Sequence, residues 1–351
     1  MSQLKQPKKH LNDVYVMRPI AIFLLVVWHS FIIYTGGWRE PVGFQPVESY
    51  WWLAKFSYAF MLELFVFVSG YVLGLTLERK NPSFKELFIS KVKRLIIPSL
   101  IFSAVYYIIF YNIDNFTIVG FLWDILNGCG HMWFLPMLFW TTLIAFGWEK
   151  LKLPQWLKLV GVYCLPVLSL LPIPLGVSSA MYYIPFFYTG LVIYRRREDI
   201  VASLCNHLMV NVLFGGVFVV LFITATIVGR DVLSVYTESS SLIVKGVALV
   251  CKNYLRLLCA VSGVAFVYSL VNYLIEGKKI VIPRWLVELN GLCFGIYLFQ
   301  QFILQILYYK TTLPSLVGSY WLPWVGLVIT LILSYLLTKL SLKTKLGRQL
   351  M

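Results

Sequence analysis

The first long apolar stretch of the chain, Met17–Ser30, reads MRPIAIFLLVVWHS, and Arg18 and His29 are its only ionisable residues. With its flanks it extends over about residues 14–35. An α-helix needs roughly 20 apolar residues to cross the hydrocarbon core of a bilayer. The stretch therefore predicts a transmembrane helix, and similar runs recur along the rest of the chain.

The overall composition supports a membrane environment. Of the 351 residues, 60% are hydrophobic and 13% are charged, whereas soluble domains average about 45–50% and about 25%. This excludes a disordered chain, a secreted disulfide scaffold and an ordinary soluble enzyme. The six cysteines are scattered, form no C-x-x-C motif and show no metal-like pairing with the four histidines. We therefore expect no metal site.

Apolar runs of about 20 residues recur along the whole length and predict a single integral-membrane domain, 1–351. The fold class expected is an all-α, polytopic membrane helical bundle of about ten transmembrane helices. We place these spans near residues 14–35, 55–77, 95–111, 132–149, 157–175, 180–194, 209–228, 254–275, 286–309 and 316–340.

The basic residues predict the orientation of this bundle. The chain has 30 Lys and Arg against 15 Asp and Glu, and the basic residues lie in short clusters between apolar runs, which excludes nucleic-acid binding. With the N-terminus inside, 22 of the 30 fall on inner segments and seven on outer ones. Such a bias is typical of cytoplasmic loops. Both termini are therefore expected in the cytoplasm.

Ionisable side chains inside spans are costly, so each suggests a function. Arg18 and His29 are eleven residues apart, which places them on one helix face about 16 Å apart along the axis. Glu63, in the second span, falls at about the depth of His29. A carboxylate beside an imidazole fixes its tautomer and raises its basicity, as a general base requires. The alternatives are a snorkelling arginine, a packed histidine and a protonated core glutamate.

Three further motifs suggest binding. Lys91, Lys93 and Arg94 precede an apolar run and suit a cytoplasmic phosphate clamp, although anchoring at the inner surface also explains them. His131 and Trp133 open the fourth span on the outer side and are typical of a carbohydrate platform or an aromatic anchor. Ser69 is assigned to substrate binding, with close helix packing as its alternative.

Together these residues resemble the integral-membrane acyltransferase family 3, which includes bacterial carbohydrate O-acetyltransferases. The resemblance rests on four motifs in this order: Arg18-x10-His29, Phe65-x3-Ser69-Gly70, Lys91-x2-Arg94-Leu95-x2-Pro98 and His131-x-Trp133-Phe134-Leu135. It covers nearly the whole chain and is strongest from about residue 10 to 140.

The resemblance implies an acyltransferase that moves an acyl group, usually acetyl, from acyl-CoA on the cytoplasmic side to a hydroxyl of a cell-envelope glycan. Acetyl-CoA would be the co-substrate, bound by Arg18, Lys91, Lys93 and Arg94. Its thioester would lie near His29, which acts either as a general base or as an acyl carrier. The acceptor would be a glycan or a lipid-linked sugar, and the location a bacterial cytoplasmic (inner) membrane.

Two positions depart from the family pattern. Where many members carry a histidine after a late Tyr-Leu pair, this chain has Gln300 and Gln301. Either that position is not catalytic, or Gln300 and Gln301 donate hydrogen bonds to the substrate. The basic motif begins with Lys91 instead of arginine, which weakens bidentate phosphate binding there.

Two other classes of protein remain open from the sequence. In a transporter or flippase, Arg18, His29 and Glu63 would form a proton relay or a binding site. A non-catalytic membrane scaffold would leave the Arg18–His29 spacing without explanation.

Overall fold

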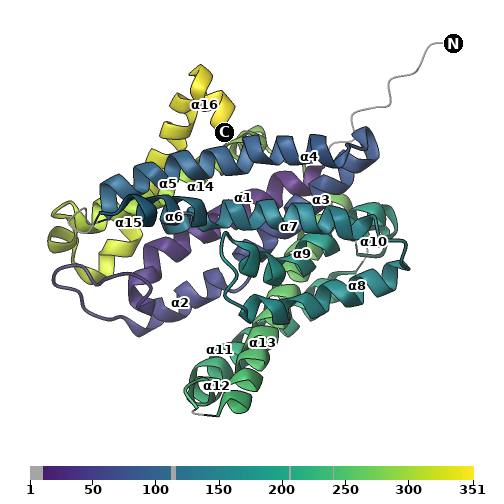
Figure 1. Cartoon of the computed structure of the whole chain (residues 1–351), viewed down its shortest axis with the longest axis horizontal. Coiled ribbons are helices and arrows are strands. Elements are labelled where there is room, and N and C mark those ends of the chain that lie inside the picture. The colour runs from purple at the N-terminus through teal and green to yellow at the C-terminus, as the bar shows by residue number, and fades with distance from the viewer. Residues whose placement is uncertain (1–10, 112–115, 205–206, 240) are drawn as a thin grey trace.

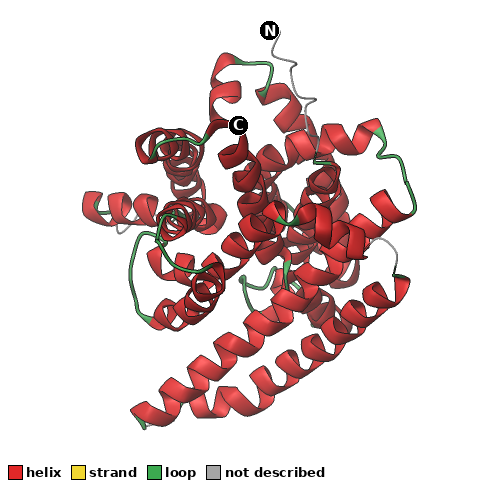
Figure 2. Cartoon of the chain, turned by 90° about the vertical axis from the view of Figure 1, so that its right-hand side faces the viewer, coloured by secondary structure: helices red, strands yellow, loops and turns green. Residues whose placement is uncertain are grey.

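The computed structural model describes residues 11–111, 116–204, 207–239 and 241–351. Every regular element within these ranges is helical (Figure 2), so the all-α expectation is confirmed. The helices of the first half are α1 (Asn12–Phe31), α2 (Glu48–Tyr58), α3 (Met61–Lys80), α4 (Phe84–Lys91), α5 (Ile97–Phe110), α6 (Ile118–Asn127), α7 (Phe134–Glu149) and α8 (Gln155–Cys164). Those of the second half are α9 (Val177–Arg195), α10 (Arg197–Leu204), α11 (Leu208–Ile227), α12 (Leu233–Thr237), α13 (Leu242–Asn272), α14 (Arg284–Tyr309), α15 (Leu313–Ser341) and α16 (Lys345–Leu350).

The number of membrane spans differs from the expected ten. Within the described ranges, seven helices are long and apolar enough to cross a bilayer, or eight if α6 and α7, bent by 61°, count as one span. Each expected span does coincide with a helical segment. However, α8 and its 3₁₀ extension are short, and the tyrosines and serines of α9 lower its hydropathy. Because α9 is largely buried by protein, it does not need a lipid-like surface.

The most extensive contact between helices in the described ranges joins α3 and α9. A Cβ atom added to Gly70 would lie 1.9 Å from the carbonyl oxygen of Phe187, and one added to Gly190 would lie 2.1 Å from that of Phe67. The two backbones therefore touch at these glycines, and a larger residue would push the helices apart. This agrees with the packing alternative considered for the Ser69-Gly70 pair.

Helix α1 passes through the interior of the bundle, where it contacts α2, α3, α14 and α15 (Figure 1). Arg18 lies near its first turns and His29 in its last turn. Because α1 is enclosed by neighbouring helices, the face that carries both residues lies inside protein instead of facing lipid.

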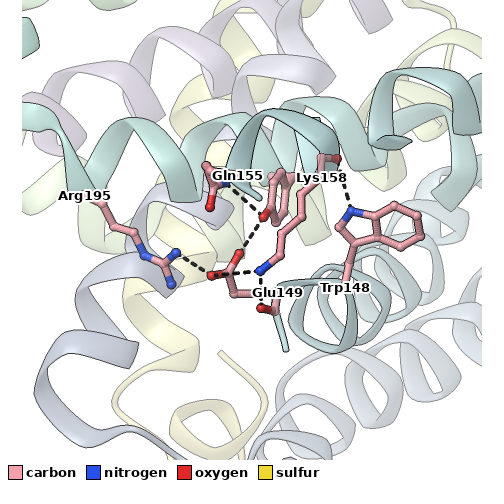
Figure 3. A network of polar contacts seen from close by, with 6 residues as sticks. Trp148, Glu149, Gln155, Lys158 and Arg195 are labelled. Atoms are coloured by element: carbon pink, nitrogen blue, oxygen red, sulfur yellow. Dashed lines mark hydrogen bonds and ion pairs between the residues drawn. The ribbon is translucent and has the colours of Figure 1, made fainter. Parts of the chain in front are cut away.

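Three basic connections assigned to the inner side lie together. Asn81, Lys150 and Arg195–Arg197 all border one cavity of about 640 Å³. A polar network fixes α7, α8 and α9 at this end (Figure 3). Its centre is Glu149, whose carboxylate lies 2.6 Å from Arg195 and 3.8 Å from Lys158 and accepts a 2.5 Å hydrogen bond from the Tyr188 hydroxyl.

Helices α11 and α13 form an antiparallel hairpin that projects from the rest of the bundle (Figures 1 and 2). Only 11% of the most apolar window of α11 is buried inside the protein. Its exposed side chains, such as Met209 and Val212, are apolar. This hairpin therefore presents a surface suited to lipid.

Candidate functional site

A cationic cavity of about 510 Å³ lies at the Arg18 end of α1, and we call it the inner cavity. Arg18, Lys91 and Arg94 line it, and their charges lie close enough to interact. The structure therefore brings together three of the four residues that the sequence assigned to CoA. Three cations around one cavity form a site for a polyanion such as a phosphate group.

Lys93 lies in the same helical turn as Arg94 but does not line the inner cavity, and the backbone of this turn is irregular. Pro98 has no N–H to continue the α-helical ladder, and the segment Val92–Ile96 widens into a π-helical turn in which Ile97 donates to the Val92 carbonyl. Lys93 is exposed and does not line the inner cavity.

Sequence reasoning did not select Arg348 for this site. Arg348 belongs to the C-terminal helix α16 and lines the inner cavity as a fourth cation. In the sequence it resembles any other basic residue of a cytoplasmic tail. Ser69 also lines the inner cavity, with its hydroxyl donating to the carbonyl of Phe65 one turn earlier.

A second cavity, of about 410 Å³, lies at the His29 end of α1, and we call it the outer cavity. His29 and His131 both line it, with ring centroids 6.3 Å apart and ring planes at 67° to each other. Trp38 stacks on His29 at 5.7 Å, and Trp133 forms another part of the wall. The site thus places two imidazoles among aromatic rings, which suits both proton transfer and contact with sugar faces.

The position of His131 depends on the break between α6 and α7. Gly128 and Gly130 both have positive φ, and a Cβ atom on Gly128 would lie 2.5 Å from the Trp133 nitrogen. The chain can therefore fold back only with glycine at this position. A 3₁₀ turn, Gly130–Trp133, then carries His131 into the bundle.

Hydrogen bonds determine the tautomer of His131. Its Nε2 lies 3.2 Å from the carbonyl oxygen of Leu298, and the Tyr297 hydroxyl donates to the His131 carbonyl. Because a carbonyl only accepts, Nε2 carries the proton and Nδ1 is left as an acceptor. That Nδ1 and the Nδ1 of His29 are buried without a hydrogen-bond partner in the described part of the chain.

Gln300 is fully buried, and its side-chain amide interacts with the imidazole of His29. Both atoms of its amide lack a hydrogen bond of normal geometry within the described residues. The neighbouring Gln301 is different, because its amide donates to the Tyr106 hydroxyl at 3.0 Å. Of these two glutamines, Gln301 lines the outer cavity, whereas Gln300 lines neither the inner nor the outer cavity.

The structure does not join Glu63 to His29. Glu63 is fully buried, does not line the outer cavity and lies 3.2 Å from Nη2 of Arg256. That guanidinium also contacts the hydroxyls of Tyr58 and Tyr183. The expectation that Glu63 orients the imidazole is therefore not supported, because its carboxylate serves as the counter-ion of an arginine 193 residues away.

The inner and outer cavities share part of their walls. Leu62, Phe134 and Tyr297 each line both cavities. The cationic cavity at one end of α1 is therefore separated from a histidine pair at the other end by a short apolar and aromatic partition. A long, thin ligand with an anionic head and an uncharged arm has the matching shape.

A sequence-family model described as an acyltransferase domain matches residues 11–339. The match includes His29, Ser69, Arg94 and His131, whereas Arg348 lies beyond it. No curated protein and no solved structure shows a significant match to the chain.

Proposed function

Because this chain belongs to acyltransferase family 3, we propose that it moves an acetyl group from acetyl-CoA to a hydroxyl of a cell-envelope glycan in a bacterial inner membrane. The family membership and the many apolar helices make it a multi-pass membrane acyltransferase. The single observation that carries the finer proposal is the meeting of a cationic cavity and a histidine-lined cavity at Leu62, Phe134 and Tyr297.

The donor binds in the inner cavity. The 3′-phosphate and pyrophosphate of CoA contact Arg18, Lys91 and Arg94, with Arg348 as a fourth cation. The uncharged pantetheine arm extends past the shared partition toward His29. Lys93 lies outside the cavity and is left out of the donor site.

Chemistry takes place at the His29 end. An unprotonated ring nitrogen of His29 accepts the proton of the acceptor hydroxyl, and the hydroxyl oxygen attacks the thioester carbonyl carbon. The C–S bond then breaks, and the departing CoA thiolate takes the proton from the imidazolium. A route through an acylated His29 uses the same residue and gives the same products.

The remaining polar groups in and beside the outer cavity assist this step. Gln300 is fully buried and does not line this cavity, so its amide acts through the His29 imidazole beside it and not on the substrate directly. His131 offers its unpaired Nδ1 as an acceptor for a sugar hydroxyl. Trp38 and Trp133 provide aromatic faces for the sugar ring.

The arrangement of the charged groups disfavours the transporter alternative. A proton relay through Arg18, His29 and Glu63 requires that they lie along one path. Arg18 lines the inner cavity, His29 lines the outer cavity, and Glu63 lines neither and pairs with Arg256. The three groups therefore lie at three different sites, as expected of an enzyme with distinct donor and acceptor sites.

The proposed activity is tested with detergent-purified protein and acetyl-CoA labelled in the acetyl group. We expect free CoA thiol to appear and the label to move into a glycan fraction of the bacterial envelope. Mass spectrometry of the glycan then identifies the acylated hydroxyl. A transporter would leave the thioester intact, and that result would refute the proposal.

The cytoplasmic position of the donor site gives a second prediction. A reporter inserted after Arg197, on the side that carries the basic connections, should give a cytoplasmic signal. A reporter in the connection between α14 and α15, at Thr311, should give an external signal because it lies at the other end of α14. Reversed signals at both positions would place the inner cavity outside the cell and exclude cytoplasmic acetyl-CoA as the donor.

A further inference from the structure

A third cavity, of about 570 Å³, lies between α2 and the projecting hairpin of α11 and α13. Four basic side chains line it, namely Lys55, Arg230, Lys252 and Arg256, and we call it the basic cavity. No acidic side chain of the described residues is part of this lining. The cavity therefore collects positive charge in a region bordered by apolar helices.

Two of the four cations are already neutralised. Arg256 pairs with Glu63 at 3.2 Å, and Arg230 pairs with Asp231 at 2.6 Å. Lys55 and Lys252 have no carboxylate within 4 Å in the described part of the chain. The positive charge of Lys55 is instead repelled by those of Lys252 and Arg256. Holding several positive charges close together beside a membrane is unfavourable in free energy unless a bound anion compensates their repulsion.

The same residues stand out in the charge pattern of the sequence. Only seven Lys and Arg were assigned to outer segments, and four of those seven line this one cavity. Anchoring to the cytoplasmic surface cannot explain basic residues on the opposite side. Their convergence from α2, α11–η6 (Leu208–Val232) and α13 points to a shared ligand.

The basic cavity adjoins the outer cavity. Tyr58 lines both, its ring stacks on Trp28 at 4.4 Å, and its hydroxyl lies 3.5 Å from Arg256. An anion bound by the lysines would therefore be held beside the cavity that contains His29. The wall of the basic cavity includes Phe222 of α11, a helix that is mostly exposed and apolar, so the cavity lies next to a surface suited to lipid.

From this geometry we propose that the basic cavity binds the phosphate group of an amphiphilic acceptor, a lipid-linked sugar phosphate, and so presents its hydroxyl to His29. This assignment rests on the function proposed above, since it names the acceptor of that reaction. A phosphate offers several anionic oxygens that several cations can share, which a single carboxylate does less well. The neighbouring apolar wall favours an amphiphile over a soluble sugar phosphate.

The test measures binding of dodecyl phosphate to protein in dodecyl maltoside micelles, with dodecanol as the neutral match. The wild type should bind dodecyl phosphate, and the double variant Lys55→Gln, Lys252→Gln should bind it about 10²- to 10⁴-fold more weakly, because two charge-assisted contacts are lost. The control is Lys245→Gln, an exposed lysine of α13 that does not line the cavity, which should bind normally. Each single lysine variant is measured as well, in case the double variant does not fold.

Three outcomes would overturn the assignment. If dodecanol binds as tightly as dodecyl phosphate, the cavity does not recognise the phosphate group. If glucose 1-phosphate binds as tightly, the cavity does not require an apolar chain. Equal competition by phosphatidylglycerol would assign the cavity to a bilayer lipid instead of an acceptor.

Turnover of acetyl-CoA by the wild type separates this inference from the proposed function. Turnover without dodecyl phosphate binding refutes the inference alone. Binding of dodecyl phosphate without any turnover of acetyl-CoA refutes the proposed reaction but still supports an anion-binding site in the basic cavity.

Discussion

Replacing His29 by alanine should lower acyl transfer by about 10²–10⁴-fold while the protein still inserts and binds acetyl-CoA, since loss of a general base typically has an effect of this size. His29 lies in the last turn of α1, faces His131 and lines the outer cavity. In the proposed complex the phosphates of CoA bind at the other end of α1, so the affinity for CoA should hardly change. Transfer of label and affinity for CoA are measured on the same purified sample.

A matched control for this variant is His207→Ala. His207 is exposed and lines neither the inner nor the outer cavity, so its replacement should leave transfer unchanged. Turnover close to wild type in His29→Ala would remove the histidine from the mechanism. A variant that no longer binds CoA would indicate a structural role for His29 instead.

The fold follows from the sequence where a helix meets lipid and less well where it meets protein. The apolar runs of α11 and α15 predict helices directly, because these helices are mostly exposed to the surroundings of the protein and their hydropathy reflects a lipid environment. Helix α9 is different, because it packs through Gly190 against α3 and is buried by protein along most of its length. Its tyrosines contact neighbouring helices instead of lipid. The hydropathy of α9 is therefore too low for it to be identified as a membrane span by hydropathy alone.

The candidate site shows the same limit. The helical spacing of Arg18 and His29 predicted that they share one face of α1. The basic motif predicted that Lys91 and Arg94 belong to one site, and both line the inner cavity. The partner of Glu63 could not be predicted from depth in the membrane, since every outer cation is an equal candidate. Arg256 is selected only by the packing of α13 against α3.

The remaining donor-site prediction concerns Arg94. Arg94→Ala should raise the apparent KM for acetyl-CoA by about 10- to 150-fold, which is the effect of losing one charge-assisted phosphate contact. Arg94 lines the inner cavity beside Arg18 and Lys91. Those two cations remain in the variant, so binding should be weakened and not abolished. The maximal rate at saturating donor should change far less, because Arg94 lies at the opposite end of the path from His29.

Lys93→Ala is the matched control, because it removes a positive charge from the same π-helical turn without changing the lining of the cavity. If the phosphates are bound as proposed, the KM of this variant stays close to that of the wild type. An equal rise in both variants would mean that the general positive charge of the turn attracts the donor. A loss of protein abundance in Arg94→Ala with an unchanged KM would instead assign this arginine to anchoring at the membrane surface, where basic side chains at a helix start are common. The comparison of two neighbouring residues therefore separates a defined phosphate contact from the charge bias that first indicated the topology.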